Sequence, residues 1–141
     1  MKVAIASDHA GFPLKQHLVK FLSDKGYEVS ALGTDSTESC DYPVFADKLC
    51  RTISDGTCQL GILVCGTGIG MSMAANKHKG IRAAVCENTF SSEFTRRHNN
   101  ANVLCLGARV IGSGLAEKIT ETFLESPFEG GKHQRRIDMF D

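Results

Sequence analysis

The chain lacks an excess of charge of either sign, because its 16 basic residues balance its 16 acidic residues. Without net charge, no long-range field favours nucleic acid or an anionic membrane as a partner. The chain also lacks any apolar run near the ~18 residues that cross a membrane. Its first stretch, MKVAIASDHAG, holds only a short apolar run before Asp8. We therefore expect neither a signal peptide nor a membrane span, and a cytoplasmic protein.

Several sequence patterns are also missing. The six cysteines contain no CxxC pair, so we expect free thiols and neither a zinc site nor a disulfide framework. Internal repeats, low-complexity segments and interdomain linkers are absent. A chain of this length buries roughly 68–70% of its unfolded surface, which suits one domain. We expect a single domain over residues 1–141, with residues 127–141 as a basic tail that packs on a partner subunit.

Five short apolar runs predict β-strands, and helical patterns lie between them. The strands are expected at residues 2–7, 27–33, 60–66, 81–86 and 102–108. The helices are expected at residues 13–25, 43–55, 88–98 and 113–125. All strands but the second are nearly continuously apolar, which predicts central, buried positions. The alternation predicts βαβ units, and hence an α/β fold with a doubly wound parallel sheet inside a three-layer αβα sandwich.

Polar or glycine-rich residues follow three of the predicted strands. In an open α/β sheet, ligands bind beyond the carboxyl ends of the strands. The first strand leads into Asp8 and His9, the third into Cys65 and the loop 66–70, and the fifth into Arg109. This edge of the sheet is therefore the candidate site.

The loop after Cys65 has the sequence GTGIG, with glycines at 66, 68 and 70. Glycines at the start of a helix let backbone N–H groups converge on an anion, and the helix end also favours a thiolate. A turn built only for close packing, with Cys65 as a small buried residue, remains an alternative. The loop is neither GxGxxG nor a P-loop, and Met71 stands where a cysteine phosphatase carries arginine.

Two of the five histidines are candidates for function. His9 has Asp8 as a polar neighbour and His98 has Asn99, and we expect both histidines to reach one edge of the sheet. A histidine near a helix end or on an apolar helix face is more often structural. His17 and His78 are therefore interpreted as structural.

Six motifs, in order along almost the whole chain, carry a family resemblance. They are SDHAG (7–11), DYP (41–43), CGTGIGMSMAANK (65–77), GIRA (80–83), RRHNNANVLCLGAR (96–109) and EGGKHQRR (129–136). Together they resemble the type B ribose-5-phosphate isomerases, a family that includes isomerases of galactose 6-phosphate and allose 6-phosphate. The resemblance implies a Rossmann-like, homodimeric or tetrameric aldose–ketose isomerase of the pentose phosphate pathway, without cofactor or metal.

The resemblance also implies roles for individual residues. Cys65 matches the general base that moves a proton between C1 and C2, and Thr67 matches a hydroxyl that shuttles protons. Asp8 and His98 match the groups that open the furanose ring. The remaining matches hold the enediolate, orient the sugar or bind its phosphate: Gly66, Gly68, Gly70, His9, Tyr42, Asn99, Arg109, Lys132 and Arg136.

Two positions depart from the family pattern. Some members carry a glutamate base where this chain has Met71, which makes Cys65 the better assignment here. Lys132 stands where arginine is frequent, so the bidentate fork is lost and Arg136 becomes the closer phosphate ligand. Two alternatives stay open: an isomerase of a six-carbon sugar phosphate, and a regulatory module that binds a nucleotide without chemistry.

Overall fold

The protein folds around a five-stranded parallel sheet with the strand order β2-β1-β3-β5-β4. The structure is a computed structural model that describes residues 1–141. The strands are β1 (Lys2–Ser7), β2 (Glu28–Leu32), β3 (Leu60–Cys65), β4 (Ala83–Val85) and β5 (Val103–Gly107). The helices are α1 (Phe12–Asp24), α2 (Tyr42–Ser54), α3 (Ile69–Ala75), α4 (Thr89–Asn99), α5 (Ser113–Glu125) and α6 (Lys132–Ile137). The predicted α/β fold is confirmed.

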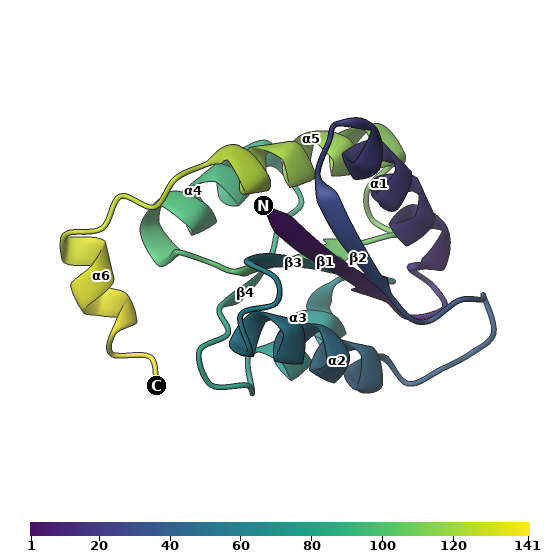
Figure 1. Ribbon diagram of the computed structural model, residues 1–141, viewed down its shortest axis with the longest axis horizontal. Coiled ribbons are helices and arrows are strands. Elements are labelled where there is room, and N and C mark those ends of the chain that lie inside the picture. Colours follow the sequence, from purple (N-terminus) through teal and green to yellow (C-terminus); the bar gives the residue numbers. More distant parts are fainter.

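Helices cover both faces of the sheet, as Figure 1 shows. On one face, α1, α4 and α5 bury a core that includes Leu18, Ile119 and Phe123. On the other face, α2 and α3 bury a second core that includes Leu49 and Met71. Full burial of such side chains contributes about 1.5–3 kcal/mol each, so the two cores hold the helices against the sheet. No helix is long and apolar enough to cross a membrane.

The sequence signals for helix ends act as predicted. Pro13 lies in the first turn of α1, where its missing N–H costs nothing. The Asn88 side chain accepts a hydrogen bond from the Ser91 N–H at 2.8 Å and caps α4. Gly26 follows α1 with φ at +91°, a left-handed conformation that suits glycine.

The prediction that the fourth strand is central is wrong. β4 pairs only with β5 and forms an edge of the sheet. Its residues still pack against both cores, Ala84 on one face and Val85 on the other. A continuous apolar pattern therefore reports that both faces are covered, not that both neighbours are strands. The Asn76 side chain occupies part of the open edge, donating to the Ala83 carbonyl at 2.9 Å and accepting from its N–H at 2.8 Å.

Candidate active site

Cys65 is the last residue of β3, and its side chain lies at the carboxyl edge of the sheet. The residue is only 5% exposed. The Gly68 N–H donates to Cys65 Sγ at 3.1 Å. This donor fixes the sulfur at the start of the loop, and deprotonated cysteine is the form that accepts protons. All six cysteines are free thiols, and Cys65 is the one that ends a strand at this edge.

The loop that follows Cys65 presents unused backbone donors. The N–H groups of Gly66, Thr67 and Gly70 donate to no other group in the chain. The loop can approach β5 closely because Gly68 has φ at +81° and a Cβ there would lie 3.0 Å from the Leu106 carbonyl carbon. Free backbone amides in a glycine-rich loop at the start of a helix are donors that can bind an oxyanion.

Three more predicted site residues lie beside this loop. Asp8 is buried and its Oδ1 accepts from the Gly11 N–H at 3.0 Å, while its own N–H donates to the Val64 carbonyl at 3.2 Å. A Cβ on Gly66 would lie 3.4 Å from Nη1 of Arg109, and a Cβ on Gly70 would lie 2.8 Å from the ring of Tyr42. Strands β1, β3 and β5 and the start of α2 therefore bring these side chains to one edge.

His9 also belongs to this edge and is half-buried. Its Nδ1 accepts from the Cys40 N–H at 3.3 Å and lies 3.7 Å from Cys40 Sγ. This backbone hydrogen bond keeps the proton of neutral His9 on Nε2, which can then donate to a ligand. The role of Cys40 in holding His9 was not predicted, because no sequence pattern in the loop 34–41 indicates which residue it contacts.

The prediction that His98 reaches the same edge within one chain is wrong. Helix α4 runs antiparallel to the strands, so its last turn lies at the amino edge of the sheet. The Asn99 carbonyl accepts from Nε of Arg82, directly before β4, at 3.1 Å. His98 and Asn99 therefore lie at the opposite edge from Cys65.

The tail residues are also remote from Cys65 in the same chain. Helix α6 packs against α4, and Figure 1 shows it at the end of the molecule away from the carboxyl ends of β1 and β3. Lys132 and Arg136 on this helix are exposed and make no ion pair. Their positive charges are available to an anion that approaches from outside this chain.

His98 is instead part of a polar cluster with the tail. Its ring stacks on that of His133, with centroids 4.2 Å apart and planes 10° apart. Glu129 lies beside both rings and pairs with Nε of Arg97 at 2.6 Å. This hydrogen bond is the main cause that lowers the pKa of Glu129, whereas partial burial and His98 lower the pKa of His133. No pattern in the sequence indicated a role for Glu129 or His133.

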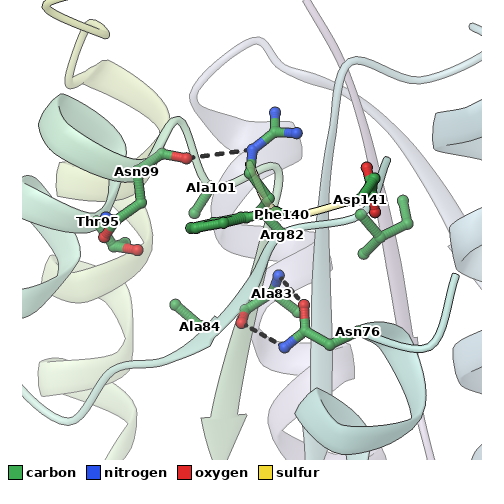
Figure 2. Close-up of a pocket in the computed structure, with 10 residues that line it drawn as sticks. Asn76, Arg82, Ala83, Ala84, Thr95, Asn99, Ala101, Phe140 and Asp141 are labelled. Atoms are coloured by element: carbon green, nitrogen blue, oxygen red, sulfur yellow. Dashed lines mark hydrogen bonds between the residues drawn. The ribbon is translucent and has the colours of Figure 1, made fainter. Parts of the chain in front are cut away.

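A cavity of about 380 Å³ lies at the amino edge, between β4, α4 and the last residues of the chain. Figure 2 shows the Arg82, Asn99 and Phe140 side chains around it, with Asn76 on the strand edge. Cys65 does not line this cavity. The carboxyl edge, with its thiol and unused amides, is the candidate active site, whereas His98 and Asn99 lie at the amino edge.

Comparisons with known proteins agree with one family. Residues 3–140 match the ribose/galactose isomerase family. The chain is 45% identical to ribose-5-phosphate isomerase B of Escherichia coli (strain K12), covering 97% of this chain and 92% of the relative. It is also 45% identical to the D-erythrulose-4-phosphate isomerase of Pectobacterium atrosepticum, covering 98% and 91%. A crystal structure of a ribose 5-phosphate isomerase from Thermotoga maritima is 51% identical, with a TM-score of 0.98 and coverage of 99% and 97%.

Proposed function

The chain belongs to the ribose/galactose isomerase family, and from this we propose that it interconverts D-ribose 5-phosphate and D-ribulose 5-phosphate through a cis-enediol. It is an aldose–ketose isomerase, and its pathway is the pentose phosphate pathway. The observation that carries the chemistry is the Cys65 thiol next to three backbone N–H groups that have no partner in the chain.

In the proposed mechanism, Cys65 is the only base at the reacting carbons. The thiolate takes the proton from C2 of the open-chain aldose, and the electrons of the C–H bond form the C1–C2 double bond. The protonated thiol then returns the proton to C1, giving the ketose. Thr67 moves protons between the sugar oxygens. Amide donors at Gly66 and Gly70 hold the developing oxyanion, and each such donor lowers the barrier by about 2.7–4 kcal/mol.

The site is completed by a second copy of the chain. His98, Asn99, Lys132 and Arg136 lie away from Cys65 in one chain, yet they are the residues that the family assigns to ring opening, orientation and phosphate binding. A two-fold dimer lets one chain's α4 and α6 reach the carboxyl edge of the other. The exposed apolar side chains of Ile69 and Met73 on α3, 49% and 65% exposed, support an interface beside the loop. Asp8, Tyr42, His9 and Arg109 complete the site from the first chain.

The test of the function is direct conversion of ribose 5-phosphate by the purified protein, followed as ribulose 5-phosphate. Cys65→Ala should lose at least about 10³-fold in kcat with little change in KM, because the base acts on the reaction and not on binding. Cys40→Ser is the matched control, since Cys40 is a half-exposed thiol whose backbone N–H bonds His9, and serine keeps a polar side chain beside the ring that Sγ contacts at 3.7 Å. A Cys65→Ala protein with near-normal kcat would place the base elsewhere.

Substrate length is the second quantity to measure. The family includes galactose isomerases, and the Pectobacterium relative is named for a four-carbon sugar phosphate. Lys132 binds phosphate as a point charge, without the geometry that fixes a chain length. We expect kcat/KM for ribose 5-phosphate to exceed that for erythrulose 4-phosphate and for allose or galactose 6-phosphate. A preference for a four- or six-carbon substrate would replace the assignment.

The nucleotide-binding alternative makes a different prediction. A regulatory module would bind ATP or NAD tightly in a calorimetric titration and would turn over no sugar phosphate. We expect no such binding, because one donor of this short loop, the Gly68 N–H, is already taken by the Cys65 thiol. We place the protein in the cytoplasm, where reducing conditions keep its six thiols free.

A further inference from the structure

The cluster of His98, Glu129 and His133 joins α4 to the segment before α6. One ligand atom from each of the three residues lies within 4.8 Å of the others. Nε2 of His98 is 3.8 Å from one carboxylate oxygen of Glu129, and Nε2 of His133 is 3.7 Å from the other. Two imidazole nitrogens and a carboxylate are the ligand set of many zinc sites with three protein ligands.

These separations are close to those of a metal site. Ligands about 2.0–2.1 Å from a tetrahedral zinc ion lie roughly 3.3–3.4 Å apart. The pair of His133 Nε2 and Glu129 Oε1 is therefore within about half an ångström of the required spacing, whereas the other separations, which reach at most 4.8 Å, must shorten by up to about 1.5 Å. The stacked rings must turn out of their parallel arrangement so that each nitrogen lone pair points at the ion. The side chains of His98 and Glu129 are 40% and 36% exposed, whereas that of His133 is 13% exposed, so His98 and Glu129 make most of the adjustment and water can supply a fourth ligand.

The surroundings orient Glu129 for this role. Nε of Arg97 donates to Oε2 of Glu129 at 2.6 Å, which leaves Oε1 for an ion. Outer hydrogen bonds to a ligating carboxylate are typical of metal sites. Glu93 also pairs with Arg97, so these three charges sum to minus one. The positive charges on α6 weaken the attraction, and we expect a dissociation constant on the order of 10 μM.

We propose that His98, Glu129 and His133 bind a divalent transition metal ion such as Zn²⁺, and that this ion inhibits the enzyme. The nitrogen of His98 that holds the ion cannot exchange a proton with the ring oxygen of the sugar at the same time. The ion takes no part in the isomerisation. The inhibition rests on the proposed function, whereas the binding rests on the cluster alone.

The binding experiment uses the full-length protein after dialysis against EDTA. Calorimetric titration with ZnCl₂ should give one ion per chain, and Co²⁺ should give the absorption of a tetrahedral site. His133→Ala should weaken both by at least about tenfold, as should Glu129→Gln. His17→Ala is the matched control, because His17 also pairs with a glutamate, Glu117, at 2.5 Å on the surface. Circular dichroism checks that each variant is folded.

The inhibition experiment measures isomerase activity against added Zn²⁺. The wild-type protein and His17→Ala should lose activity over the concentration range in which the ion binds, and EDTA should restore it. The activity of His133→Ala, measured relative to its own activity in EDTA, should resist the same concentrations of Zn²⁺. A Cys65→Ala protein that still binds the ion separates this cluster from the catalytic thiol.

Two results would overturn the proposal. One is the absence of stoichiometric binding, or equal binding by wild type and His133→Ala, which tests the cluster even if the protein shows no isomerase activity. The other is binding at the cluster with inhibition that persists unchanged in His133→Ala, which would assign the inhibition to another site such as Cys65.

Discussion

Two inactive variants should restore each other's activity if each active site is built from two chains. Cys65→Ala removes the base at the carboxyl edge, and Arg136→Ala removes a phosphate ligand on α6. These residues lie at opposite ends of the folded molecule, since α6 packs on α4 and not near β3. In a two-fold dimer, Cys65 of one chain then faces Arg136 of the other.

The magnitude follows from counting sites. When the two variants are unfolded together in equal amounts and refolded, random pairing makes half of the dimers mixed. Each mixed dimer has one site that carries both substitutions and one site that carries neither. Since one site in two is intact in half of the dimers, about a quarter of wild-type activity should return.

The assay compares refolded mixtures with each variant refolded alone, using conversion of ribose 5-phosphate. A differently tagged subunit shows that mixed dimers have formed. The matched control pairs Cys65→Ala with Asp8→Asn, because Asp8 and Cys65 lie at the same edge of one chain. Every site in that mixture carries a defect, so no activity should return beyond that of the separate variants. Mixed dimers of Cys65→Ala and Arg136→Ala without recovered activity would refute the shared site.

Three further predictions test the loop after Cys65, the buried thiol of Cys86 and the helix that carries His98. Gly107→Ala places a Cβ 2.7 Å from the Thr67 carbonyl oxygen, so it should displace the loop, lower kcat at least tenfold and lower the free energy of unfolding by about 1–3 kcal/mol. Gly112 has open space around it, so Gly112→Ala should have none of these effects. Equal effects of the two substitutions would contradict the geometry. Burial raises the pKa of Cys86 to about 11. The folded state therefore keeps this thiol neutral where the unfolded chain ionises it, so its stabilisation is complete below about pH 9 and is lost between there and about pH 11. In urea unfolding, the free energy of unfolding of Cys86→Ala should fall by about 0.8 kcal/mol less than that of wild type between pH 7 and pH 9.5. An equal fall in the two proteins would refute this. Asn88→Ala removes the cap of α4 and should lower the free energy of unfolding by about 0.5–2 kcal/mol in the same assay, with no change expected if the cap is not formed.

The sequence by itself determined the elements and half of the candidate site. Apolar runs and their spacing predicted five strands and the main helices, because burial on both faces leaves a pattern along the chain. The sequence also placed Asp8, Cys65 and Arg109 together, since the carboxyl ends of parallel strands meet at one edge of the sheet. These properties depend on residues near one another in sequence or on the direction of the strands.

The tertiary structure decided where each element lies in space. The edge position of β4 depends on the order of strands, which a pattern of covered faces does not encode. The position of His98 at the amino edge follows from the antiparallel return of α4, and its partners Glu129 and His133 come from a segment about 30 residues later. Contacts between such distant segments arise only when the helices pack, because no local preference of the chain specifies them.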